Sequence, residues 1–151
     1  MLRFNSKGAY NLPVGNVDFN KNVYNALANY FSTIQGRIIK WSSVDFRDFF
    51  TNFSPLKNDF IYLDPPYLIT FSEYNKYWNT TEEADLLAIL DQLNTKKVRF
   101  AISNVTHYKE KENSLFVEWA SRYHIHPIKS NYISYHDNSI KTFKEVLVTN
   151  Y

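Results

Sequence analysis

The tetrapeptide Asp64-Pro65-Pro66-Tyr67 combines a carboxylate, two prolines and an aromatic ring, and it directly follows the apolar run Phe60–Leu63. The run is rich in β-formers, so it predicts a buried strand. Proline fixes φ and lacks an N–H donor, so the strand would end at a stiff loop that offers hydrogen-bond acceptors. In an open α/β sheet, loops at the carboxyl ends of strands are where ligands bind.

These residue types suit methyl transfer to a planar amino nitrogen such as N6 of adenine. The lone pair of that nitrogen is delocalised into the ring, and two acceptors on its N–H groups would free it. The carboxylate of Asp64 can supply one acceptor and the carbonyl of Pro65 the other. Such preorganised acceptors would face the positive charge that develops on the nitrogen. Tyr67 could stack on a base that has left the duplex, a contact worth roughly 1–3 kcal/mol.

A plain strand followed by a turn is the alternative interpretation of the tetrapeptide. Asp and Pro are common turn residues, and this motif alone would fit either interpretation. The preceding strand favours the functional interpretation, because it supplies the structural context that the motif requires.

Apolar residues at helical spacing predict helices that would flank the strands. One begins at Asp18 and ends at Gly36, a second covers 45–53, a third is capped by Thr80 or Thr81, and a fourth covers 113–122. Strands are expected at 37–41, 60–63, 98–103, 123–128 and 145–149. Helices that alternate with strands predict an α/β fold, in which a mostly parallel sheet of about five strands carries helices on both faces.

Length and composition fit a single globular domain. The chain has 151 residues, 44% of them hydrophobic, and its aromatic content is high, with twelve Tyr and twelve Phe. A net charge of +2 is compatible with a nucleic-acid partner without establishing one. The chain has no Cys, and its four His residues, His107, His124, His126 and His136, show no metal-ligand spacing. We therefore expect no metal, and the lack of a long apolar run predicts no membrane partner.

Several segments resemble, in the same order, the Dam-like (D12-class) adenine-N6 DNA methyltransferases. The matching segments are Arg3–Gly15, Ser43–Phe46, Asp64–Tyr67, Phe100–Asn104, Asn131–Tyr135 and Glu145–Tyr151. The resemblance spans nearly the whole chain, and the tetrapeptide together with Arg3–Gly15 makes it specific. It implies a partial Rossmann-like methyltransferase sheet whose last strand runs antiparallel.

The resemblance also implies roles for individual residues. Asp64, Pro65, Pro66 and Tyr67 would be the catalytic motif, and Asp45, Phe46 and Asp64 would contact the cofactor S-adenosylmethionine. For Asp45 and Phe46 the alternative is a helix start, with Asp45 as the N-cap and Phe46 in the core, and both roles can hold at once.

Double-stranded DNA is the partner that the resemblance implies. Residues 1–17 would form a DNA-contacting arm or hairpin, for which the alternative is a disordered terminus, and residues 18–151 would form the catalytic part. The expected DNA contacts are Arg3, Asn5, Lys7, Asn11, Tyr132 and Tyr135. Surface solvation is the alternative for Arg3, Asn5 and Lys7. For Asn11 the alternative is a structural role within the arm, and for Tyr132 and Tyr135 it is ordinary strand-end packing.

One feature departs from the family pattern. Family members begin with a Gly-rich cofactor loop, whereas this chain has only Gly8, Gly15 and Gly36, with no cluster. We expect a carboxyl-terminal portion of a methyltransferase, arising as a split subunit, a truncated gene or an engineered piece. A second chain with the Gly-rich motif, or self-association through an exposed sheet edge, would then be a partner. The expected location is the cytoplasm of a bacterial or phage-type host, with the nucleoid.

The leading functional hypothesis is site-specific methyl transfer from S-adenosylmethionine to adenine N6 in duplex DNA, with base flipping, as part of a larger enzyme. The first alternative is a catalytically inactive DNA-binding remnant, or a subunit of a split restriction-modification methyltransferase. The second alternative is an RNA or protein N-methyltransferase, because related motifs act on other planar nitrogens. The Arg3–Gly15 resemblance favours DNA.

Overall fold

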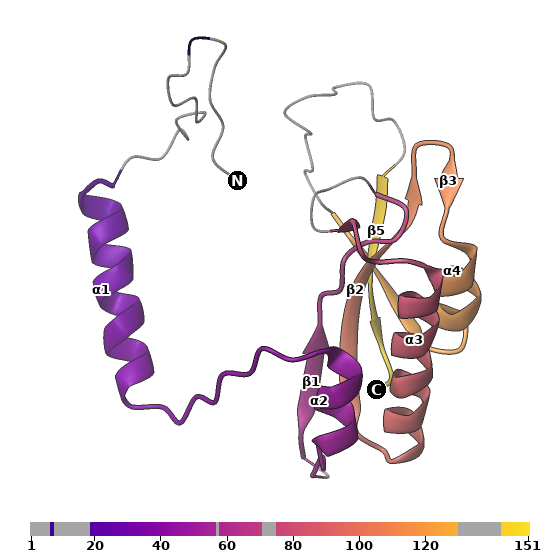
Figure 1. The fold of residues 1–151 in the computed structure, drawn as a ribbon, viewed down its shortest axis with the longest axis horizontal. Helices are drawn as coiled ribbons and strands as arrows, with labels where there is room; N and C mark the ends of the chain where they lie inside the picture. The colour runs from indigo at the N-terminus through magenta and orange to yellow at the C-terminus, as the bar shows by residue number, and fades with distance from the viewer. Residues whose placement is uncertain (1–6, 8–18, 57, 71–74, 130–142) are drawn as a thin grey trace. The chain divides into compact units, whose positions relative to one another are not determined.

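The computed structural model describes residues 7, 19–56, 58–70, 75–129 and 143–151. The chain divides into two compact units, Met1–Ser43 and Val44–Tyr151, and each is described by itself. Figure 1 shows the elements of both units.

The first unit contains one described helix, α1 (Lys21–Gln35). Its N-cap is Asn20, whose side chain accepts hydrogen bonds from the backbone N–H groups of Asn22 and Val23. The predicted cap at Asp18 was therefore wrong, because Asn20 supplies the same kind of acceptor closer to the first turn. The helix ends at Gly36, as predicted.

The strand predicted over 37–41 is absent, since these residues have no regular secondary structure. Ile38 and Trp41 are 95% and 80% exposed. A β-rich run forms a strand only where a neighbouring strand pairs with it and covers one face, and residues 37–41 pair with no strand of the described chain.

The second unit contains a mixed five-stranded sheet with the order β1-β2-β5-β4, and β3 pairs with β2. The strands are β1 (Phe60–Leu63), β2 (Arg99–Tyr108), β3 (Lys111–Glu112), β4 (His124–Ile128) and β5 (Phe143–Thr149). β1 pairs with β2 in parallel, whereas β5 is antiparallel to both β2 and β4. The antiparallel last strand is confirmed. The sheet is mixed rather than mostly parallel, because β5 lies between β2 and β4 and makes both of those pairings antiparallel.

Helices α2 (Phe46–Asn52), α3 (Thr80–Thr95) and α4 (Ser114–Ala120) match three of the predicted helices. The N-cap of α3 is Asn79, which accepts from the backbone N–H groups of Thr81 and Glu82. We predicted Thr80 or Thr81, but Asn79 has the extended backbone that an N-cap needs and carries a side-chain acceptor.

All three helices of this unit pack against one face of the sheet (Figure 1). Alternate residues of β2, Phe100 and Ile102, enter the core that these helices cover. Tyr62 is 58% exposed and contacts Ser103, which points to the opposite face. Helices on both faces were predicted, but the described part of this unit has them on one face only. The core residues are Leu86, Leu87, Leu90, Leu93, Val98, Phe100, Ile102, Phe116, Trp119, Ala120, Val146 and Val148.

Candidate active site

Asp64 lies immediately beyond the carboxyl end of β1, as the sequence predicted. The parallel register pairs Leu63 with Ile102, so the next residue of β2, Ser103, lies beside Asp64. The Ser103 hydroxyl donates a hydrogen bond of 2.8 Å to Oδ1 of Asp64. Ser103 is itself buried, so this bond fixes the carboxylate from the sheet side.

Tyr67 is anchored through its hydroxyl to the last strand. The hydroxyl donates to Oε1 of Glu145 on β5 at 2.8 Å, and it lies 3.4 Å from Oδ1 of Asp64. Burial of the phenol, together with the hydrogen bond to Glu145, raises the pKa of Tyr67 well above its ordinary value. The phenol is protonated, and its single hydrogen is donated mainly to Glu145, the nearer of the two carboxylates.

The segment after Tyr67 forms a hydrogen-bonded turn. The side-chain amide of Asn75 donates to the Tyr67 carbonyl at 2.6 Å and to the Thr70 carbonyl at 3.0 Å. The backbone N–H of Thr70 also donates to the Tyr67 carbonyl, at 3.1 Å. The loop that contains residues 64–67, called the Asp64 loop below, is thus fixed at both of its ends.

An aromatic cleft of about 540 Å³ opens beside the Asp64 loop. Asp64, Pro65 and Pro66 contribute to its lining together with Phe46 and Trp78. Its size falls within the range of about 300–1,000 Å³ that is usual for small-molecule sites. The cleft therefore brings together two predicted cofactor residues, Phe46 and Asp64. The complete lining is Phe46, Phe49, Phe50, Phe53, Phe60, Ile61, Tyr62, Leu63, Asp64, Pro65, Pro66, Trp78 and Leu86.

Asp45 serves as the N-cap of α2, which was the alternative role considered for it. Its Oδ1 accepts from the backbone N–H of Arg47 at 2.8 Å, and its Oδ2 lies 3.5 Å from the Arg47 guanidinium. Asp45 is not part of the cleft lining. Phe46 fulfils the structural role too, because it packs against the core while it faces the cleft.

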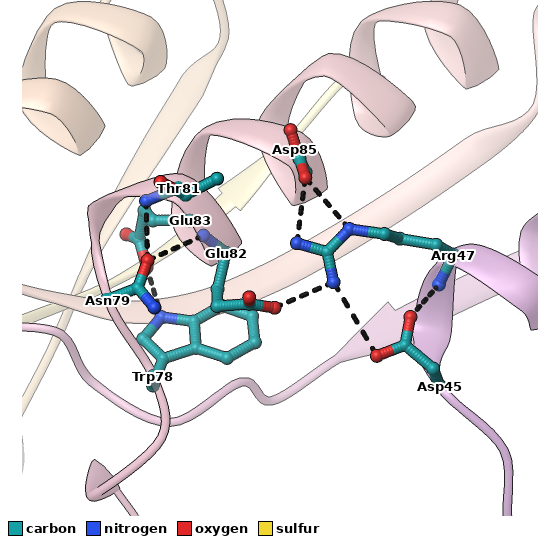
Figure 2. Close-up of polar contacts among 8 residues, drawn as sticks. All are labelled: Asp45, Arg47, Trp78, Asn79, Thr81, Glu82, Glu83 and Asp85. Atoms are coloured by element: carbon teal, nitrogen blue, oxygen red, sulfur yellow. Dashed lines mark hydrogen bonds and ion pairs between the residues drawn. The ribbon is translucent and has the colours of Figure 1, made fainter.

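Arg47 ties the start of α2 to the first turns of α3. Figure 2 shows its guanidinium between Asp45, Glu82 and Asp85. It contacts Glu82 at 2.7 Å and Asp85 at 2.7 Å, and these hydrogen bonds raise the pKa of Arg47 further above its ordinary value. The same guanidinium lies 4.5 Å from the ring centroid of Phe46. The cleft wall at Phe46 is thus held by contacts from α3.

The predicted DNA contacts lie mostly beyond the part of the chain that the structure describes. Lys7 is described and exposed. Arg3, Asn5, Asn11, Tyr132 and Tyr135 fall outside the described residues.

No group of three or more His, Cys, Asp or Glu side chains in the described segments could hold a metal ion. His124 and His126 lie on β4. Among the same residues, none of the helices combines the length and apolar character of a membrane span.

Sequence reasoning missed Ser103 and Glu145 as site residues. Glu145 carried a signal, because it is an acidic residue at the start of an otherwise apolar strand, 145–149. Ser103 carried a weaker one, as a polar residue next to Asn104 at the end of an apolar run. Buried polar side chains in central strands need partners, and here the partners belong to the Asp64 loop.

Comparison with known proteins finds a methyltransferase family and three similar methyltransferases or methylases. The family model described as D12 class N6 adenine-specific DNA methyltransferase matches residues 1–134. The chain is 40% identical over 160 residues to Type II methyltransferase M.FokI of Planomicrobium okeanokoites, covering 99% of the chain and 24% of that protein. It is 40% identical over 162 residues to Modification methylase StsI of Streptococcus sanguinis, with coverage of 99% and 24%. It is 31% identical over 163 residues to Modification methylase LlaI of Lactococcus lactis subsp. lactis, with coverage of 100% and 24%. The chain thus spans about a quarter of the length of these relatives.

Proposed function

Because this chain belongs to the D12 class of N6 adenine-specific DNA methyltransferases, we propose that it forms the part of such an enzyme that holds the target base. Its reaction would be methylation of adenine N6 in duplex DNA, at a specific site and with the base flipped out of the helix. The observation that carries this proposal is the Asp64 loop, whose carboxylate is fixed by Ser103 and whose aromatic ring is fixed by Glu145, beside an aromatic cleft.

Asp64 and Pro65 would accept hydrogen bonds from the amino group of the adenine. The Ser103 hydroxyl donates to Oδ1 of Asp64, and the Tyr67 hydroxyl lies near the same oxygen. Oδ2 is therefore the oxygen that would bind the substrate. The amino nitrogen would gain the methyl group that the cofactor supplies, would carry a positive charge, and would then release one proton to solvent. A carboxylate that is already oriented stabilises this charge without having to reorganise.

Tyr67 would stack on the flipped adenine. Its hydroxyl is held by Glu145, so the ring is oriented before the base arrives. The phenol is neutral at physiological pH, so it can donate to Glu145, and burial and this contact raise its pKa further above the ordinary value. Preorganisation of this kind lowers the entropy cost of ordering the stacked pair.

The aromatic cleft fits the adenosyl part of S-adenosylmethionine. Its walls offer rings for packing against a purine, and Asp64 is among its lining residues. Phe46 and Asp64 would contact this cofactor, and Asp45 would add a polar contact from the start of α2. S-adenosylmethionine, when bound, supplies the methyl group from its sulfonium centre.

DNA would be contacted outside the cleft. We propose that residues 1–17 form the DNA-contacting arm, with Arg3, Asn5, Lys7 and Asn11, and that residues 18–151 form the catalytic part. Tyr132 and Tyr135 would line the pocket for the flipped base. The Arg3–Gly15 resemblance is the reason to prefer DNA over RNA or protein as the substrate.

The test is the Asp64→Ala variant in an assembly that transfers methyl groups, assayed with labelled cofactor on duplex DNA, RNA and protein. We expect incorporation into duplex DNA by the unaltered protein and its loss in the variant. Asp59→Ala is the matched control, because Asp59 lies just before β1, where it accepts from the backbone N–H of Leu56. Undiminished methylation by Asp64→Ala would refute the role assigned to this carboxylate.

A catalytically inactive DNA-binding segment, or a subunit of a split restriction-modification methyltransferase, is the second candidate. The scarcity of glycine favours it, because the only glycines are Gly8, Gly15 and Gly36. In that case a second chain with a Gly-rich loop, or self-association, would complete the enzyme. Calorimetry of this chain with S-adenosylmethionine separates the candidates, since tight binding by this chain alone would contradict an incomplete cofactor site.

A further inference from the structure

Glu83 is a buried carboxylate that none of the steps above uses. Its side chain lies in the first turn of α3 and is 1% exposed. Its Oε2 accepts from the indole N–H of Trp78 at 2.7 Å. Its Oε1 accepts from the side-chain amides of Asn104 and Asn113, each at 2.9 Å. Burying a carboxylate is costly, and here the compensation comes from neutral donors.

Trp78 connects Glu83 to the aromatic cleft. The indole of Trp78 lines the cleft, and its ring centroid lies 5.8 Å from that of Phe46. Figure 2 shows the indole of Trp78 beside Glu83 at the start of α3. Trp78 is not part of a helix or strand, and its backbone N–H donates to the Asn75 carbonyl at 3.0 Å. The orientation of its indole therefore depends on side-chain contacts.

Asn104 connects Glu83 to the Asp64 loop. Asn104 directly follows Ser103 on β2, and the Ser103 hydroxyl holds Asp64. Successive residues of a strand point to opposite faces, so β2 carries the Glu83 contact on one face and the Asp64 contact on the other. One strand therefore links the cleft wall at Trp78 to the carboxylate of Asp64.

We propose that Glu83 is a positioning residue for the cofactor site. Its carboxylate fixes the indole of Trp78 as a cleft wall against Phe46, and Asn104 and Ser103 on β2 connect it to Asp64 beyond the end of β1. The adenosyl group of the cofactor then meets a surface that is already formed. This inference rests on the proposed function, because it takes the aromatic cleft as the cofactor site.

Glu83→Gln breaks the Trp78 contact selectively. The side-chain oxygens of Asn104 and Asn113 accept from the backbone N–H groups of Val105 and Phe116, so both amide NH₂ groups must face residue 83. A glutamine would turn its single oxygen toward these two donors. Its own NH₂ group would then face the indole N–H of Trp78, and the hydrogen bond to the indole would be lost.

Two measurements test the proposal on the chain itself. The first is hydrogen exchange of the indole N–H groups by ¹⁵N NMR, in which Trp78→Phe assigns the Trp78 signal among the three tryptophans. The second is calorimetric titration with S-adenosylhomocysteine, a stable analogue of the cofactor. We expect Glu83→Gln to speed exchange at Trp78 and to weaken binding roughly tenfold, the scale of one lost hydrogen bond to a charged group.

Asp91→Asn is the matched control. Asp91 is an acid on the same helix, and it accepts from the indole N–H of Trp119 at 2.8 Å. This variant should change exchange at Trp119 and leave the affinity for S-adenosylhomocysteine unchanged. In the Trp78→Phe background, Glu83→Gln should have little further effect on affinity, because the two residues act through one contact.

The results separate a failed positioning role from a failed cofactor site. Binding that is unchanged by Glu83→Gln would overturn the positioning role and leave the cofactor site standing. An equal loss of affinity in the Trp78→Phe background would also overturn it, because Glu83 would then act through general stability. Absence of binding by the unaltered chain would overturn a cofactor site formed by this chain alone, as the second candidate function expects, and the positioning role in this chain with it.

Discussion

Replacing Tyr67 by phenylalanine should uncouple the Asp64 loop from the last strand while keeping the aromatic ring. The hydroxyl of Tyr67 donates to Glu145 at 2.8 Å, and this contact joins residues 78 positions apart in the sequence. Phenylalanine fits the same space and lacks only the hydroxyl. The variant therefore tests the anchor of the ring separately from its stacking surface.

The magnitude follows from the charge and burial of the pair. A hydrogen bond to a charged group contributes about 1.5–3 kcal/mol to stability. Tyr67 and Glu145 are both only partly buried, so solvent screens the contact. We therefore expect Tyr67→Phe to lower the free energy of unfolding by about 1–2 kcal/mol, at and just below the lower end of that range.

A double-mutant cycle measures the contact itself. The free energy of unfolding would be obtained by urea denaturation at neutral pH for Tyr67→Phe, Glu145→Ala and the double variant. The interaction energy should be about 1 kcal/mol, because each single change removes the same hydrogen bond. Tyr123→Phe is the matched control, since its hydroxyl donates to a different carboxylate, Asp91, at 2.7 Å.

Two outcomes would refute the reasoning. An interaction energy below about 0.3 kcal/mol would mean that Tyr67 and Glu145 are not coupled. An equal interaction energy between Tyr123→Phe and Glu145→Ala would mean that the cycle reports a general loosening of the fold. Additive behaviour of the control pair is therefore required.

Two further predictions concern pH and helix capping. Burial and a hydrogen bond to Asp91 raise the pKa of Tyr123 to about 12, and burial and Glu145 raise the pKa of Tyr67 above the ordinary 10.0. When the folded-state pKa is raised, the resulting stabilisation is complete below the unfolded-state pKa and is lost as pH rises through the folded-state value. The free energy of unfolding should therefore fall above about pH 10, and less steeply in Tyr67→Phe and Tyr123→Phe. Urea denaturation over the alkaline range measures this. Asn79→Ala should lower the free energy of unfolding by about 1 kcal/mol, because Asn79 caps α3 through two backbone N–H groups. Thr80→Ala should change the free energy of unfolding by less than Asn79→Ala, and thermal melting of both variants would contradict the cap assignment if Thr80→Ala had the larger effect.

Local patterns predicted the elements that bury an apolar face. The strand 60–63 and the helix α3 were predicted from the spacing of their apolar residues. In the structure both elements pack these residues against the core. The segment 37–41 has the same β-rich composition, yet it forms no strand, because β-propensity expresses itself only through pairing and burial. The N-caps of α1 and α3 were misplaced by one or two residues, whereas Asp45 caps α2, which was one of its two predicted roles. Several polar residues near a helix start can act as the N-cap, and backbone geometry decides which one does.

The part of the candidate site that lies in one short segment could be predicted from the sequence. Asp64 and Tyr67 lie three residues apart on a loop that directly follows β1. Ser103 and Glu145 could not be assigned in the same way, because their roles depend on the strand order β1-β2-β5 and on its register. Glu83 illustrates the same limit, since its partners come from the loop before α3, from β2 and from the N-cap of α4.

The contact between Tyr67 and Glu145 makes the site depend on the whole sheet. β5 inserts between β2 and β4, and its pairing with β2 places Leu147 opposite Ser103, two residues beyond Glu145. The two residues that fix the Asp64 loop therefore lie on adjacent strands that are distant in sequence. Until β5 pairs with β2, Asp64 can be held by Ser103, but Tyr67 has no anchor on Glu145. The tetrapeptide predicts the proposed chemistry, whereas the orientation of its ring requires β5 to be paired with β2.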